Sequence, residues 1–101
     1  MSKVVKQVQR VQQELARVQE ELARERVEAS SGGGAVRAVV TGQGELVELH
    51  IAPEAVDPQE TSLLEDLVVT AVNEALRRAR ELATSRMQAI TGGLQIPGLF
   101  G

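Results

Sequence analysis

Apolar residues recur at alternating intervals of four and three along the first segment of the chain, the spacing of one face of a helix. The positions of this stripe are Val4, Val8, Val11, Leu15, Val18 and Leu22. The periodicity predicts a helix over about residues 2–25 with a seam like that of a coiled coil. Because the stripe is short, an amphipathic helix lying on its own domain fits equally well. In both interpretations the apolar stripe needs a partner surface.

Apolar and polar residues alternate through the middle of the chain, which predicts β-strands. A first short strand is expected over Arg26–Ser31. A tight turn is expected at Gly32-Gly33-Gly34, because glycine adopts positive φ readily. The alternating positions of the next two strands are Val36, Ala38 and Val40, then Val47, Leu49 and Ile51, with Gly42-Gln43-Gly44 turning the chain between them. The pattern therefore predicts three short antiparallel strands.

The last long segment has a helix-start sequence, Asp57-Pro58-Gln59-Glu60, with Asp at the N-cap, Pro at N1 and Glu at N3. An apolar face then continues to Ile90, and Gly92-Gly93 ends it. A helix over residues 58–90 would be about 50 Å long at 1.5 Å per residue. A compact domain of this size has a radius of gyration of only about 13 Å. The helix must therefore protrude, unless another chain covers its far end or the helix breaks.

These elements predict an α+β fold in the order α-β-β-β-α, with a three-stranded antiparallel sheet and two long helices. A single domain is expected over residues 1–93, followed by a tail at 94–101 that contains Gly and Pro. Two long apolar stripes exceed what a three-stranded sheet can cover, so we expect a two-fold homodimer.

Composition narrows the possible chemistry. The 101 residues include one Phe and no Trp, Tyr or Cys, and a single His. Aromatic base stacking and cysteine zinc sites are therefore excluded, so nucleic-acid binding would depend on charge. Neither glycine cluster opens a helix after a strand or precedes a Gly-Lys-Ser/Thr, which argues against a phosphate loop. We expect no enzyme activity, cofactor, metal or small-molecule substrate. Without a signal peptide or an apolar span, a cytoplasmic protein is expected and no membrane contact.

Charge is unevenly distributed, although the net charge is only −3. The first 26 residues carry six basic and four acidic side chains, whereas residues 45–66 carry seven acids and no Lys or Arg. A seven-residue spacing places four basic residues on one ridge of the first helix, away from the apolar stripe: Lys3, Arg10, Arg17 and Arg24, with Lys6 beside them. The ridge can be a partner-binding surface or a solvated face balanced by neighbouring acids.

The balancing acids are unevenly placed. Glu20 precedes Arg24 by four residues, and Glu14 and Glu21 follow Arg10 and Arg17 by four. A solvated face balanced by acids and a partner-binding surface therefore fit Arg17 and Arg24 equally well, whereas Arg10 lies in an N-terminal stretch without acids. No acid lies near Lys3 or Lys6. On the last helix, Arg77 and Arg78 follow Glu74 by three and four residues and are expected to pair with it. Arg86 has no acid three or four residues away on either side, so it is expected to be free.

Several short motifs, in order, resemble the YbaB/EbfC family of bacterial nucleoid-associated proteins. They are SGGGAV at 31–36, GQG at 42–44, LEDLV at 64–68, AVNEA at 71–75, and MQAITGGL at 87–94 followed by IPGL at 96–99. The resemblance covers nearly the whole chain. It implies a tweezer-like homodimer whose protruding helices grip DNA, a location on the nucleoid, and a link to recombination or replication.

Two functions follow from these observations. In the first, a homodimer binds double-stranded DNA mainly through phosphates with little base reading, using Lys3, Lys6, Arg10 and Arg17 of the first helix and Arg77, Arg80 and Arg86 of the last. In the second, the chain is a protein-interaction scaffold, in which the acidic middle or the apolar segment 94–100 docks a recombination or replication protein.

Overall fold

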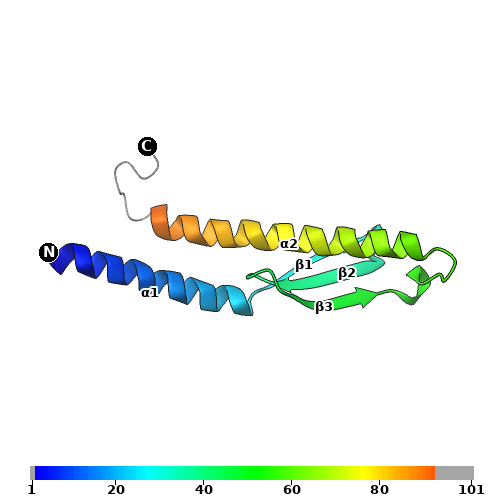
Figure 1. The fold of residues 1–101 in the computed structure, drawn as a ribbon, viewed down its shortest axis with the longest axis horizontal. Coiled ribbons are helices and arrows are strands. Elements are labelled where there is room, and N and C mark those ends of the chain that lie inside the picture. Colours follow the sequence, from blue (N-terminus) through cyan, green and yellow to red (C-terminus); the bar gives the residue numbers. More distant parts are fainter. Residues whose placement is uncertain (1, 93–101) are drawn as a thin grey trace.

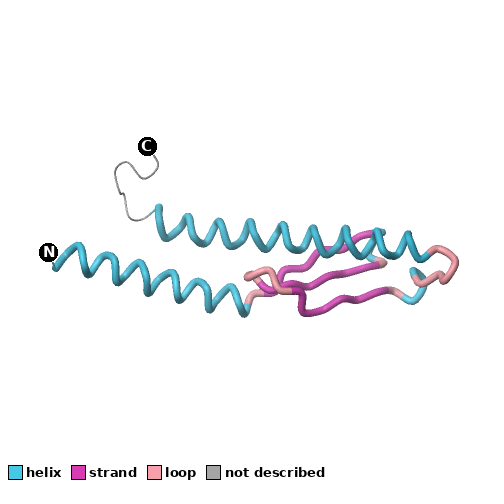
Figure 2. Tube along the Cα trace, viewed as in Figure 1, coloured by secondary structure: helices cyan, strands magenta, loops and turns pink. Residues whose placement is uncertain are grey.

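The computed structural model describes residues 2–92 as an elongated α+β domain (Figures 1 and 2). Its elements are α1 (Ser2–Arg24), β1 (Arg26–Ser31), β2 (Val36–Thr41), β3 (Leu46–Ile51) and α2 (Thr61–Gly92), with short 3-10 turns at Gly32–Gly34 and Pro53–Ala55. The predicted order α-β-β-β-α is confirmed. The molecule measures 68 × 27 × 16 Å with a radius of gyration of 19.2 Å, well above the value for a compact domain of this length. Both helices therefore extend beyond the sheet as arms.

The sheet is antiparallel, in the order β1-β2-β3. Ala38 of β2 lies opposite Ala29 of β1 and Leu49 of β3, and a register shift follows Val39. The turn between β1 and β2 requires left-handed backbone, with φ at Gly33 of +68°. A side chain would be strained in that conformation, which explains the glycine run. Within the sheet β3 pairs only with β2, so it is an edge strand.

The predicted start of the last helix, with Asp57 as N-cap and Pro58 as the first helical residue, is wrong by three residues. The Asp57 carboxylate accepts a hydrogen bond from the Gln59 amide at 3.0 Å, and its carbonyl accepts one from the Glu60 amide at 2.9 Å. These bonds close a separate turn, which Asp and Pro also favour, and α2 begins only at Thr61. It then continues for 32 residues without interruption to Gly92, so the helix does not break.

The core lies where α2 crosses β1 and β2. Three alanines at four-residue spacing, Ala71, Ala75 and Ala79, pack against the sheet with essentially no exposed area. Their sheet partners include Val36 and Val40, which are also fully buried. Small side chains on the helix let its backbone approach the sheet closely, while the valines supply the apolar volume. This alanine face positions the long arm of α2 relative to the strands.

The C-terminal half of α1 is attached to the sheet, whereas its N-terminal half is not. Leu22 is only 1% exposed, and its carbonyl accepts a hydrogen bond from the Gly42 amide at 2.8 Å. The Gln43 side chain donates to the Gln19 carbonyl at 3.1 Å. Farther out, Val4 is 65% and Val8 51% exposed. The helix therefore lies on its own domain through its last turns only.

Gly42 leaves no room for a side chain at this junction. A Cβ at this position would lie 2.7 Å from the Leu22 carbonyl oxygen, which is backbone and cannot move aside cheaply. Gly42→Ala is expected to lower the free energy of unfolding by about 1–3 kcal/mol, measured by urea denaturation. Gln43→Ala, which removes an exposed hydrogen bond from the next residue, is the control. Equal stability of Gly42→Ala and the unmodified protein would contradict the observed packing.

Candidate nucleic-acid interface

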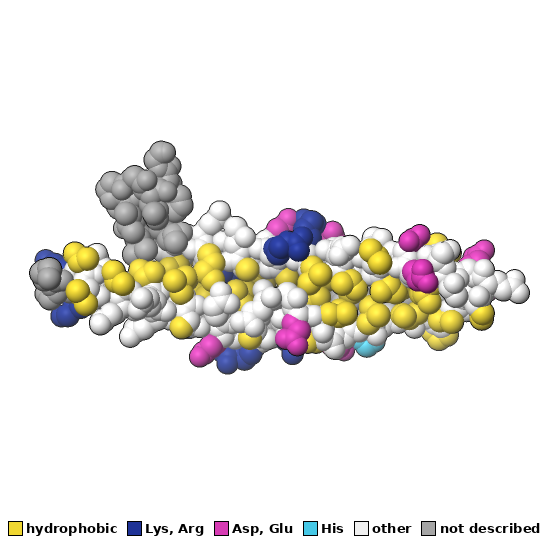
Figure 3. Space-filling view, viewed as in Figure 1, with side chains coloured by type: hydrophobic (Ala, Val, Ile, Leu, Met, Phe, Trp, Pro, Cys, Tyr) yellow, Lys and Arg dark blue, Asp and Glu magenta, His cyan; other side chains and the backbone are white. Residues whose placement is uncertain are grey.

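The first turns of α1 carry three exposed basic residues, Lys3, Lys6 and Arg10. Within residues 2–92 none of them forms an ion pair, and the first acid along the helix is Glu14. Figure 3 shows Lys and Arg atoms at this end of the molecule with no acidic atoms beside them. Cations near a helix N-terminus oppose the helix dipole, so these residues do not stabilise α1. Their charge is available to a partner.

Arg17, farther along the same ridge, is neutralised by its own helix. Its guanidinium donates to Glu14 at 2.5 Å and to Glu21 at 2.6 Å. The hydrogen bond from Arg17 holds the pKa of the Glu14 carboxyl below its ordinary value. Arg10 forms no ion pair with Glu14 within the described residues, because Arg17 takes that carboxylate. A Glu20–Arg24 ion pair is also absent from the described part of the chain.

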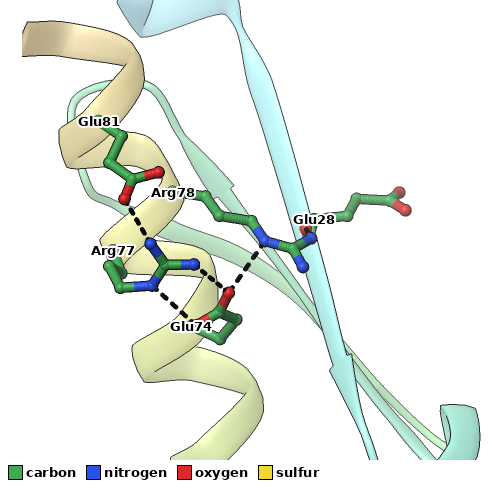
Figure 4. A network of polar contacts seen from close by, with 5 residues as sticks. All are labelled: Glu28, Glu74, Arg77, Arg78 and Glu81. Atoms are coloured by element: carbon green, nitrogen blue, oxygen red, sulfur yellow. Dashed lines mark hydrogen bonds and ion pairs between the residues drawn. The ribbon is translucent and has the colours of Figure 1, made fainter.

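Arg77 and Arg78 are held in a network on α2, as the spacing predicts (Figure 4). The Glu74 carboxylate accepts bonds from Arg77 Nε at 3.0 Å and Nη2 at 2.5 Å, and from Arg78 Nε at 3.1 Å. Arg77 also pairs with Glu81, and Arg78 Nη1 donates to the Glu28 carbonyl of β1 at 2.8 Å. This network links α2 to the sheet and leaves Arg77 with little free charge.

The network lowers the pKa of Glu74 to about 2, chiefly through the hydrogen bond from Arg77. Because the folded pKa is depressed, the network stabilises the fold fully above about pH 4.5 and is lost as the pH falls towards 2. We expect the carbon-13 carboxyl signal of Glu74 to titrate near pH 2. Arg77→Gln should raise that midpoint more than Arg78→Gln does. An unshifted midpoint for Glu74 in the unmodified protein would rule out the network.

Arg86 is a bridge between the two arms. Its guanidinium lies 2.7 Å from the carboxylate of Glu25, the residue directly after α1, and 3.6 Å from that of Glu21 on α1, and its side chain is partly buried. The expectation that Arg86 is free is therefore wrong. Its partners lie about 60 positions away in the sequence, where spacing along one helix cannot detect them. Glu21 and Glu25 are structural residues that the sequence analysis missed.

The remaining predicted residue, Arg80, is exposed on α2 beside the Gly42–Gly44 turn and forms no ion pair within residues 2–92. The only histidine, His50, is exposed and contacts Glu48 at 3.0 Å. Four of the seven predicted DNA-binding residues thus keep an unpaired charge: Lys3, Lys6, Arg10 and Arg80. The other three, Arg17, Arg77 and Arg86, already have carboxylate partners.

The acidic residues of the stretch 45–66 extend towards the end of the molecule opposite the N-terminus of α1. They lie in β3, in the loop after it and in the first turns of α2, at the end where that loop turns (Figure 1). The part of the chain that is described contains no group of three His, Cys, Asp or Glu able to hold a metal ion. Neither described helix is long and apolar enough to cross a membrane. The segment 94–101 lies outside the described residues.

Comparison with known proteins agrees with this geometry. The sequence profile of the YbaB/EbfC DNA-binding family matches residues 1–94. A nucleoid-associated protein of Pelotomaculum thermopropionicum is 49% identical over 99% of this chain and 95% of its own length. A nucleoid-associated protein of Acetivibrio thermocellus is 52% identical over 99% of this chain and 89% of its own length. The crystal structure of the uncharacterized protein HP0035 from Helicobacter pylori has the same fold, with a TM-score of 0.81 at 21% identity over 91% of this chain and 97% of that one.

These matches describe nucleoid-associated, DNA-binding proteins rather than enzymes, in agreement with the sequence expectation. The profile spans all the described elements, from the basic end of α1 to the end of α2. The chain therefore belongs to the YbaB/EbfC DNA-binding family.

Proposed function

We propose that this protein binds double-stranded DNA as a homodimer on the nucleoid, in the cytoplasm, mainly through phosphate contacts. The observation that carries the proposal is the free basic end of α1. There Lys3, Lys6 and Arg10 are exposed, unpaired within the described residues, and project on an arm far from the acidic end. Charge separated along an elongated molecule orients it towards a polyanion.

The proposed contact set has a primary and a secondary part. Lys3, Lys6, Arg10 and Arg80 form the primary part, because their charge is not already neutralised. Arg17, Arg77 and Arg86 form the secondary part, since each must share its guanidinium with a carboxylate when it meets a phosphate. Lysine and arginine on helix surfaces position a protein on the phosphate backbone without reading bases. With no aromatic platform either, the proposed binding has little sequence preference.

The proposed dimer uses the β3 side of the molecule. β3 is an edge strand, and its apolar residues are exposed, including Leu46, Leu49 and Ile51. Figure 3 shows hydrophobic atoms running as a continuous band along this face. An unpaired edge with apolar side chains is a ready site for self-association, and two-fold symmetry lets one patch serve both copies.

The phosphate mechanism is tested by changing the basic end of α1. We expect the triple variant Lys3→Ala, Lys6→Ala and Arg10→Ala to weaken binding to all duplex sequences alike. Each lost phosphate contact lowers the slope of log K against log salt by about 0.9, so the slope should flatten by up to about 3 per protomer. Fluorescence anisotropy with a labelled duplex over a salt series measures both quantities.

The matched control replaces three exposed, neutral residues of the same helix stretch: Gln9→Ala, Gln12→Ala and Gln13→Ala. It removes side chains of similar length without changing charge, so the affinity and salt slope should stay as in the unmodified protein. An unchanged slope in the basic triple variant, with the dimer intact, would contradict the phosphate mechanism. The scaffold function, with a recombination or replication protein at the acidic end, would then be favoured.

A further inference from the structure

An apolar groove separates the two arms. It has a volume of about 480 Å³, and its apolar lining comes from Val11 and Val18 of α1 and from Ala89 and Ile90 of α2. Charged side chains, among them Arg86, form its rim. Figure 1 shows α2 ending alongside the N-terminal half of α1, so the groove lies beyond the sheet. Nothing in the described part of the chain fills it.

The apolar surface continues from the groove towards the N-terminus of α1. Val8 is 51% exposed, and Val4, one turn farther along the same stripe, is also exposed. Arg10 and Arg17 also line the groove, beside Val11 and Val18, so charged side chains border its apolar strip. DNA does not match an apolar surface of this kind, because phosphates need charged or polar partners. The groove therefore needs an apolar occupant.

The sequence after α2 has that chemistry. Residues 94–100 read LQIPGLF and contain three large aliphatic side chains and the only phenylalanine of the chain, with no charged residue. This segment follows directly on Gly92 and Gly93, and α2 ends two residues beyond Ile90, itself part of the groove lining. The last described residue of α2, Gly92, is therefore only two positions after a residue of the groove lining.

Length also fits. Phe100 lies eight positions after Gly92, and an extended chain spans about 3.3–3.6 Å per position, so the segment reaches about 26–29 Å. The exposed stripe from Val11 to Val4 covers only about 10 Å of helix at 1.5 Å per residue. Covalent attachment to α2 also keeps the effective concentration of the segment high compared with a free partner.

We propose that the groove between α1 and α2 is the docking site of the chain's own segment 94–100. Leu94, Ile96, Leu99 and Phe100 cover the exposed valines of α1, removing apolar surface from water. The docked segment acts with the Arg86 bridge to set the spacing of the two arms. Lys3 and Lys6, which are not among the residues lining the groove, remain uncovered. The docking does not rest on DNA binding, although Arg10, one of the proposed DNA contacts, lines the same groove.

A single aromatic residue makes the test direct. In the full-length protein, nuclear Overhauser effects from the Phe100 ring to the methyl groups of Val8, Val11 or Val18 are expected. The His50 ring, the other source of aromatic proton signals, lies on β3 and is not among the residues that line the groove. Phe100→Leu should abolish the cross-peaks and move the valine methyl signals, because it removes the ring while keeping an apolar side chain.

A matched pair of substitutions distinguishes the loss of docking from the effect of adding a negative charge to the segment. Phe100→Asp should increase hydrogen exchange in the N-terminal half of α1, whereas Gln95→Asp, with the same new charge, should not. Absence of any contact between Phe100 and the α1 valines would overturn the proposal. So would contacts seen only between differently labelled copies of the chain, which would assign the groove to a second molecule.

Discussion

Leu22→Ala is expected to lower the free energy of unfolding by about 2–5 kcal/mol. Leu22 is the largest fully buried side chain of α1, and the backbone at the same residue accepts the Gly42 amide. Truncation leaves a cavity at the point where the arm joins the sheet. Domains of this kind are stable by only about 5–15 kcal/mol, so the loss is a large fraction of the total.

Urea denaturation followed by circular dichroism measures this effect. Val5→Ala is the control on the same helix, because Val5 is half exposed and off the apolar stripe, so its change should stay within about 0.5 kcal/mol. If both variants lose the same stability, α1 is not anchored through Leu22, and the arm does not have the position described above.

Leu49→Asp is expected to dissociate the proposed homodimer. Leu49 lies opposite the buried Ala38, on the side of the sheet that α2 covers over β1 and β2, yet Leu49 itself is 39% exposed. A carboxylate there would have to be buried without a partner when two copies associate, which is strongly unfavourable. The mass from light scattering should fall from twice the 10.8 kDa of one chain to that of one chain.

His50→Asp places the same charge on the next residue of the strand, whose side chain points to the other face. This control should leave the dimer intact. Circular dichroism confirms that both variants remain folded. A single-chain mass for the unmodified protein, or a stable dimer of Leu49→Asp, would contradict an interface centred on β3.

Local patterns were sufficient for most of the fold. The stripe from Val4 to Leu22 predicted α1 to within one residue of its end, and the alternation of apolar residues predicted the three strands. Turn chemistry was ambiguous at Asp57, because Asp and Pro favour both a helix start and an isolated turn. Only the packed structure distinguishes these two outcomes.

The candidate site was less predictable, since charge neutralisation depends on contacts between elements. Spacing along α2 correctly predicted that Glu74 pairs with Arg77 and Arg78, because all three lie on one helix. It could not predict the Arg86–Glu25 pair, which depends on how α1 and α2 lie side by side. Likewise, alternation in β3 predicted a buried face at Leu49, but α2 covers only the other two strands.

The central claim, that the free basic end of α1 contacts DNA, is tested most directly by an NMR titration of nitrogen-15-labelled protein with a short duplex. The largest amide shift changes are expected over residues 3–10, and they should diminish at high salt. The acidic end, around Asp57 and Glu65, should not change. Duplex binding that leaves the amides of residues 3–10 unmoved would contradict the account.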